Sequence, residues 1–449
     1  MAGRLSAGRR PLLALAVVLS LAGCVASDGR AVTAAGCAEY AQEASLTGQV
    51  RWQVLLDAGP ESELGPDVAP LAVGGVAVFA QNGVVHGLRL AGGQALWTYA
   101  DGPSVDGMWR WQDLVVVLGG LPGGGAASTS ETRDGRLTGL DAATGAVRWT
   151  LPVPGIGPQV YAVATADGGL AVAGTPGQLM VVDMADGAVR WSRAITDATG
   201  LAAAAGLVLY GSGGRLTAYD DRAGGRRWTA ASLDTDLPQM QPAAGLLLVS
   251  SGFGGAPVTA YALAAGRVAW TFETPGPQAG AASWEAVAAG PAGVAVAAAN
   301  VPAPGRLSLL DPATGRVRWQ AAALVGAGPL LTTAGLTDVE GTAANGPVAI
   351  VDRDAADGRI RWRDTLPQPA SDAGQGTEQL VQAGQLALVQ GSANAGQQAT
   401  LSAYQLADGR LAWQVTEPEN VEVPPVPVPG LGFLVQPDLP LSGCGPVPG

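Results

Sequence analysis

The sequence contains no lysine: its 25 basic residues are all arginines, set against 37 acidic residues for a formal net charge of −12. A Schiff-base lysine and a P-loop lysine are therefore excluded. His86 is the one histidine. This excludes sites that need a histidine pair, and we interpret His86 as structural or solvent-facing. The negative charge disfavours binding along nucleic acid, and we expect no such partner.

Long apolar runs are confined to residues 1–23, which have the pattern of an export signal. Three arginines precede the apolar stretch 12–21, which is too short to span a bilayer. The stretch ends Leu-Ala-Gly-Cys24, which resembles the lipobox of bacterial lipoproteins and implies that Cys24 carries a lipid. An ordinary signal peptide cut nearby is the alternative. The pair Arg9-Arg10 leaves the export route open.

Cysteine is scarce, with three residues in the whole chain. Once Cys24 is assigned to the lipid, Cys37 and Cys444 remain, and they bracket the rest of the sequence. In an exported protein such a pair predicts a disulfide; two unpaired thiols are the alternative. We expect residues 24–44 to form a tether and residues 45–449 to form one domain.

Tryptophan, in contrast, is abundant and regularly placed. Nine of the 12 tryptophans stand four residues after a glycine, at intervals of 37 to 52 residues. This period is typical of propellers and solenoids. A tryptophan buries about 150–250 Å², so we interpret all nine as docking groups that pack one repeat against the next. They are Trp52, Trp97, Trp149, Trp191, Trp228, Trp270, Trp319, Trp362 and Trp413.

The fullest repeats run from Asp141 to Trp149 and from Asp311 to Trp319. Their Asp, Thr and Gly predict a tight reversal, because glycine accepts positive φ and the other two hydrogen-bond nearby backbone. Strict alternation after the reversal predicts that the tryptophan and the residue two before it face inward, with the arginine between them outward. That inward residue is aliphatic in seven repeats: Val50, Val147, Val189, Val268, Val317, Ile360 and Leu411.

Each repeat carries four strand-like runs, and no window after the N-terminus has helical periodicity. The first run is rich in small residues, which suit the narrow inner end of a wedge. We therefore predict an all-β fold, an eight-bladed β-propeller of four-stranded antiparallel blades with tryptophan-docking motifs. The tail 422–436 adds two strand-like runs, which with the strand of Trp52 could form a partial extra sheet.

The stretch from Ala218 to Trp228 resembles the tryptophan-docking motif of the quinoprotein-type, PQQ-like propellers. That family includes quinone-dependent alcohol dehydrogenases and non-catalytic propeller lipoproteins of the outer-membrane barrel-assembly machinery. The dehydrogenases bind a quinone with calcium and commonly use two adjacent cysteines, which this sequence lacks. We therefore expect no cofactor and no enzymatic activity. Asp234 and Asp236 do not have the spacing of a calcium loop.

Three tryptophans fall outside the repeat register: Trp109, Trp111 and Trp284. They lie in first strands, which surround the axis of a propeller, and are the candidate binding surface. Packing at the hub is the alternative.

Together these features favour a monomeric, extracytoplasmic scaffold, held to the membrane by its lipid and binding an envelope protein. Because the chain is acidic, we expect the partner to present arginine or lysine. The alternatives are a quinoprotein-type oxidoreductase and a cell-surface ligand sensor.

Overall fold

The computed structural model describes residues 40–435 apart from internal segments, the longest of which are 56–67, 121–132, 231–238, 274–281, 370–378 and 418–425. The chain divides into two units, Gly36–Cys444 and the two ends 1–35 with 445–449. All described residues belong to the first unit. All secondary-structure elements of the described residues are β-strands, which confirms the all-β prediction.

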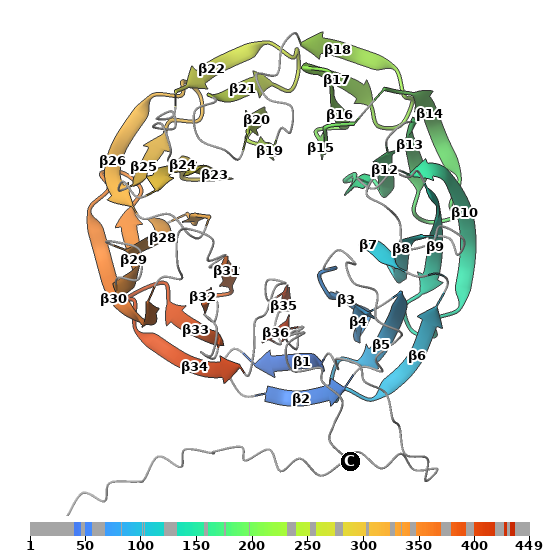
Figure 1. Cartoon of the computed structure of the whole chain (residues 1–449), viewed down its shortest axis with the longest axis horizontal. Helices are drawn as coiled ribbons and strands as arrows, with labels where there is room; N and C mark the ends of the chain where they lie inside the picture. The colour runs from blue at the N-terminus through green and yellow to red at the C-terminus, as the bar shows by residue number, and fades with distance from the viewer. Residues whose placement is uncertain are drawn as a thin grey trace, which may run out of the picture. The chain divides into compact units, whose positions relative to one another are not determined.

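Eight consecutive four-stranded antiparallel blades follow one another along the chain. Blade 1 comprises β3 to β6 and blade 8 comprises β31 to β34, with four strands for each blade between them. The first strand of each blade lies nearest the centre of the ring and the fourth lies at the rim (Figure 1). The eight predicted blades are therefore confirmed.

The strands of blades 1 to 4 are β3 Leu71–Val73, β4 Val76–Gln81, β5 Val84–Arg89, β6 Ala95–Ala100, β7 Val105–Trp111, β8 Leu114–Gly120, β9 Arg133–Asp141, β10 Val147–Ile156, β11 Val160–Ala164, β12 Gly169–Gly174, β13 Gln178–Asp183, β14 Val189–Ala194, β15 Gly200–Ala204, β16 Leu207–Ser212, β17 Arg215–Asp220 and β18 Arg226–Ala230. Those of blades 5 to 8 are β19 Gln239–Ala243, β20 Leu246–Ser250, β21 Val258–Ala262, β22 Val268–Phe272, β23 Ala282–Gly290, β24 Gly293–Val301, β25 Gly305–Leu310, β26 Val317–Ala323, β27 Leu330–Leu331, β28 Gly335–Gly341, β29 Pro347–Asp354, β30 Ile360–Pro369, β31 Gln379–Ala383, β32 Leu386–Gly391, β33 Ala399–Gln405 and β34 Leu411–Glu417.

The two ends of the domain form a ninth sheet, here called the closing sheet. Its strands are β1 Tyr40–Ser45, β2 Val50–Leu55, β35 Val426–Val428 and β36 Gly432–Val435, in the order β2-β1-β36-β35. The leftover ends thus complete a four-stranded sheet where we predicted a partial one. Strand β1 begins inside the segment predicted as a tether, so the ring starts before residue 45. The sequence of β1, Tyr-Ala-Gln-Glu-Ala-Ser, does not alternate between apolar and polar residues, so it does not by itself predict a strand. It forms one because it pairs with β36.

The closing sheet packs against both of its neighbours. Phe433 and Leu434 are consecutive residues of β36, so their side chains point to opposite faces. Phe433 belongs to the core of blade 8 and stacks on Trp413 with 5.4 Å between ring centroids. Leu434 belongs to the core shared with Phe79 of blade 1. One strand from the C-terminal end therefore joins the last blade to the first.

We expect Phe433→Ala to cost about 3–5 kcal/mol of stability, because it removes a fully buried aromatic ring from this closure. Phe433 is 1% exposed. Thermal unfolding of the full-length protein in detergent measures the effect. Pro427→Ala, at an exposed position of β35 in the same sheet, is the matched control. Equal melting temperatures for the two variants would contradict a closing role for Phe433.

The geometry of the fourth strands contradicts the prediction that the aliphatic residue two positions before the tryptophan faces inward. Val147 pairs with Leu140, whereas Trp149 pairs with Gly139, so Arg148 is an extra residue in a β-bulge. Because Leu140 and Gly139 face opposite sides of the sheet, Val147 and Trp149 do so too. The aliphatic residue before the bulge is consequently exposed, from 42% at Val317 to 55% at Val268. The predicted inward orientation was wrong for all six whose exposure is described: Val147, Val189, Val268, Val317, Ile360 and Leu411.

Candidate functional site

The docking contact between blades has the same geometry around the ring, and Trp191 illustrates it. Its indole Nε1 donates a hydrogen bond of 2.9 Å to the carbonyl oxygen of Asp221 in the next blade. Its ring covers Gly224, where φ is +64° and a Cβ atom would lie 2.6 Å from the ring. Glycine is therefore needed at this turn both for its backbone conformation and for the close approach of the ring.

Among the described residues, eight repeat tryptophans are seen to make this contact, with Nε1-to-oxygen distances of 2.7 to 3.2 Å. Each pairs with the carbonyl three residues before the glycine of the following blade. The pairs are Trp52–Leu90, Trp97–Ala142, Trp149–Met184, Trp191–Asp221, Trp228–Leu263, Trp270–Pro312, Trp319–Ala355 and Trp362–Leu406. The ninth, Trp413, stacks on Phe433. By the same spacing it would cover Gly48, which lies outside the described residues.

The turns that join the first to the second strand and the third to the fourth strand of every blade lie on one side of the ring, because consecutive strands are antiparallel. We call this side the turn face, and the third-to-fourth connections the outer turns. Asp141 illustrates their chemistry: it accepts hydrogen bonds from the backbone and hydroxyl of Thr144, and it pairs with Arg148 at 2.5 Å. Asp311, Thr314 and Arg318 repeat this arrangement in blade 6.

A larger ionic network joins blades 3 and 4 on the turn face. Asp167, in the inner turn of blade 3, accepts two hydrogen bonds of 2.9 Å from Arg190 and one of 2.8 Å from Arg222 in blade 4. Burial raises the pKa of the Asp167 carboxyl, but hydrogen bonds from Thr165 and the two arginines outweigh it and hold that pKa well below its usual range. Asp167 is therefore charged at any physiological pH and links the two blades.

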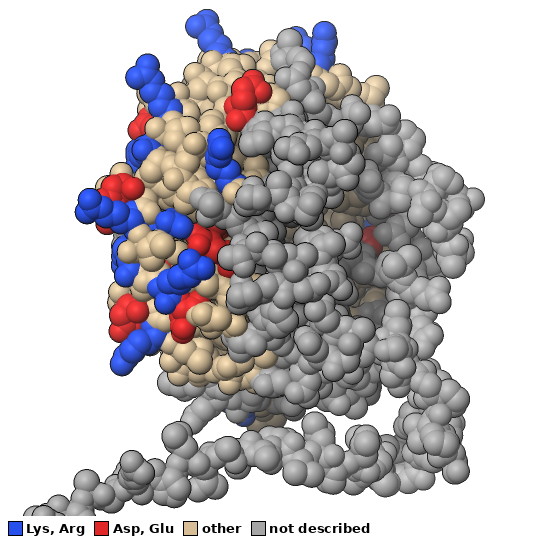
Figure 2. Space-filling view, turned by 60° about the vertical axis from the view of Figure 1, so that its left-hand side comes forward, with Lys and Arg blue, Asp and Glu red and all other residues tan. Residues whose placement is uncertain are grey.

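The turn face carries exposed arginines as well as paired ones. In Figure 2 the blue side chains of arginine project from the left-hand part of the surface. Arg267 and Arg316 lie in the outer turns of blades 5 and 6, and Arg226 is the first residue of β18, directly after the outer turn of blade 4. All three are exposed, and within the described part of the chain they have no ion-pair partner. Exposed Val268 and Val317 directly follow two of them. This part of the face is thus cationic and apolar although the whole chain is acidic.

Two of the three candidate tryptophans lie together on β7, the innermost strand of blade 2. Both pack against the core between blades 2 and 3. Trp109 folds over Gly107 of its own strand, and Trp111 lies over Gly168 in the inner turn of blade 3. Trp111 also lines, with Arg110, a shallow pocket of about 450 Å³ on the turn face. The structure thus packs both tryptophans against this core, and Trp111 in addition lines a surface pocket.

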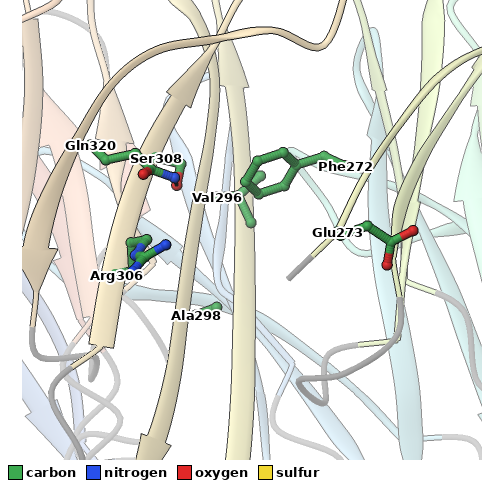
Figure 3. A pocket seen from close by; sticks show the side chains of 7 residues that line it. All are labelled: Phe272, Glu273, Val296, Ala298, Arg306, Ser308 and Gln320. Carbon is green, nitrogen blue, oxygen red and sulfur yellow. Dashed lines mark hydrogen bonds between the residues drawn. The ribbon is translucent and has the colours of Figure 1, made fainter. Parts of the chain in front are cut away.

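A second pocket, of about 290 Å³, lies between blades 5 and 6 (Figure 3). Phe272 and Glu273, at the end of β22, form one wall. Arg306 of β25 projects from the other, and nearby Gln320 donates a hydrogen bond of 3.1 Å to Ser308. Nothing in the sequence analysis pointed to this pocket, because its residues come from four strands of two blades and share no motif.

Blade 7 differs from the other blades in burying several ionisable side chains. Glu340 forms an ion pair with Arg353, and both are largely buried. Asp352 accepts a hydrogen bond of 2.9 Å from Thr337 and lies 3.2 Å from Arg361. Burial raises the pKa of Asp352 to about 6, despite these two favourable contacts. This carboxyl is therefore held in a site that prefers its neutral form.

We expect Asp352→Asn to stabilise the protein more at pH 7.5 than at pH 4. Because the folded-state pKa is raised from 3.8 to about 6, wild-type stability falls as pH rises between these values, where only the unfolded chain has lost its proton. The destabilisation is complete above pH 6 and amounts to roughly 3 kcal/mol. Asparagine does not titrate. Melting temperatures of both proteins at the two pH values measure the difference, and a pH-independent difference would contradict it.

Several predicted positions lie outside the described residues: Cys24, Cys37, Cys444, Asp234, Asp236 and the side chain of Trp284. The lipidation of Cys24 and the disulfide between Cys37 and Cys444 therefore stay predictions. His86 is buried on β5, 6% exposed. No helix in the described ranges is long and apolar enough to cross a membrane. Within the same ranges, no group of three or more His, Cys, Asp or Glu side chains is placed to hold a metal ion.

The repeats match a known family over nearly the whole propeller. A sequence profile described as outer membrane protein assembly factor BamB matches the overlapping segments 24–118, 112–208, 133–301, 197–344 and 303–432. The chain belongs to this family. A comparison with curated protein sequences finds no match.

Solved structures similar to this BamB-family chain include propellers of very different roles. A eukaryotic initiation factor has a TM-score of 0.57 at 12% identity, covering 89% of this chain and 98% of its own. BamB from Moraxella catarrhalis has a TM-score of 0.44 at 20% identity, covering 79% and 95%. A quinohemoprotein alcohol dehydrogenase from Pseudomonas putida has a TM-score of 0.45 at 12% identity, covering 83% of this chain and 74% of its own. At 12% identity the initiation factor shares the fold alone.

Proposed function

We propose that this protein is a lipid-anchored scaffold of the cell envelope that binds another protein and has no enzymatic activity. The observation that carries the proposal is the family match over residues 24–432, because that family is described as an outer membrane protein assembly factor. The architecture supports it. A ring closed by its own two ends presents a broad face of turns whose side chains can vary without disturbing the docking contacts.

The experiment is photo-crosslinking of the full-length protein in its native envelope. A crosslinkable residue replaces Val268, which is 55% exposed on the turn face, and in parallel Trp191, which is buried between blades. We expect one discrete protein adduct from position 268 and none from position 191. No adduct from any exposed position, together with a bound quinone in the absorbance spectrum or alcohol oxidation after adding pyrroloquinoline quinone with Ca²⁺, would favour the oxidoreductase instead.

A ligand sensor is a second candidate because of the pocket beside Trp111 and Arg110. An indole edge and a guanidinium at the rim of one pocket suit a small anionic or aromatic ligand. Quenching of tryptophan fluorescence by added ligand, lost in Trp111→Phe and retained in Trp109→Phe, would support this role.

A further inference from the structure

We infer that the outer turns of blades 4, 5 and 6 dock an extended acidic segment of the partner protein. The inference rests on the proposed scaffold function and names the chemistry of its partner. The surface consists of Arg226, Arg267 and Arg316, which we call the arginine arc, together with the valines Val268 and Val317.

The arc has a charge that its own turns do not neutralise. In blade 4 Asp220 is paired with Arg227 at 2.5 Å, and in blade 6 Asp311 is paired with Arg318 at 2.9 Å. The outer turn of blade 5, Ala262 to Gly266, contains no carboxylate. The remaining acidic side chain of these turns, Asp221 in blade 4, is buried, 7% exposed. The guanidinium groups of the arc are therefore left facing solvent.

Blades 7 and 8 show what the same turn looks like when the arginine is neutralised locally. Arg359 follows its turn glycine as Arg267 and Arg316 do, and it pairs with Asp357 at 3.2 Å. Arg410 pairs likewise with Asp408 at 3.1 Å. Blades 4 to 6 lack an acidic residue at that turn position. Elsewhere on the turn face, Arg89 of blade 1 and Arg110 of blade 2 are also exposed without an ion pair among the described residues. Blades 4 to 6 differ in that three consecutive blades each contribute such an arginine, two of them followed by an exposed valine.

An acidic protein segment fits this surface better than an anionic membrane does. A guanidinium binds a carboxylate through two parallel hydrogen bonds, and the valines that follow Arg267 and Arg316 offer apolar contact for aliphatic side chains of a peptide. Interfacial membrane-binding helices combine basic residues with large apolar groups such as Trp, Phe and Leu, whereas the apolar members of this surface are two valines.

The test compares two triple charge reversals in the purified full-length protein in detergent. R226E/R267E/R316E removes the arc, and R148E/R359E/R410E reverses three arginines that are paired within their own turns. The probe is a fluorescent peptide of alternating glutamate and valine, measured by anisotropy at low and high salt. We expect the arc variant to bind about tenfold more weakly than wild type at low salt, with a smaller difference at high salt, and the control to bind as wild type.

Equal binding by the two variants would overturn the inference. So would arc-dependent binding to phosphatidylglycerol vesicles with no binding of the peptide, because the occupant would then be lipid. The crosslink from position 268 separates this failure from failure of the scaffold function. If the arc variant still yields the same envelope adduct, the scaffold stands and the docking chemistry proposed for the arc is wrong.

Discussion

Trp191→Ala is expected to lower the free energy of unfolding by about 3–5 kcal/mol. The substitution empties the space between blades 3 and 4 and leaves the carbonyl oxygen of Asp221 without its indole donor. Trp191 is 8% exposed and belongs to the core that spans these blades. Differential scanning calorimetry of the full-length protein measures the loss. Trp111→Ala, at the surface pocket of the inner rim, serves as the comparison.

The same contact can be tested from its other side, at the glycine. Gly224→Ala adds a methyl group 2.6 Å from the Trp191 ring at a φ of +64°, so strain and steric overlap act together. Gly213 has a similar φ of +51° with no atom within 4 Å of an added Cβ. Gly213→Ala therefore measures backbone strain alone, about 1–2 kcal/mol. We expect Gly224→Ala to cost clearly more, and equal losses would show that the ring does not rest on this glycine.

The fold was predictable because its signal is repeated. A single Gly-to-Trp spacing says little, but nine copies at intervals of 37 to 52 residues set the number of blades and their order. The ends were harder. Tyr40–Ser45 and Gly432–Val435 belong to no repeat, and each forms a strand because the other, far away in sequence, pairs with it.

The inward orientation of Val147 failed for a local reason that alternation cannot reveal. A β-bulge adds one residue to the fourth strand before the tryptophan, and this reverses the face of everything before it. The same bulge recurs before Trp191 and Trp228. The aliphatic residue at this point looks like core in the sequence, but it lies at the rim.

Net charge is a property of the whole chain and does not give the charge of one face of the ring. A total of −12 led us to expect a basic partner patch, whereas the arginine arc calls for an acidic one. The difference comes from the topology, which brings Arg226, Arg267 and Arg316, at intervals of 41 and 49 residues in the sequence, to one side of the ring. Which of the arginines form ion pairs within their own turns can be read from the structure but not from the sequence.

Cys24→Ala is expected to move the protein from the membrane to the soluble fraction almost completely. The motivation is the apolar stretch 12–21 followed by Leu-Ala-Gly-Cys24. If two acyl chains are attached there, their burial gives stable anchoring where a single chain gives only marginal, reversible binding.

Cys37→Ala is the matched control for this change, because it removes the next cysteine along the chain and leaves the lipobox intact. Fractionation of cells, followed by immunoblotting, should find the Cys37 variant with the membrane and the Cys24 variant in the soluble fraction. If both variants stay with the membrane, Cys24 is not the anchor and an ordinary signal peptide becomes the better interpretation. If the Cys24 variant is released but still yields the crosslink from position 268 in solution, the lipid serves only to concentrate the ring beside its partner. Loss of that crosslink on release would instead make membrane attachment part of the binding geometry.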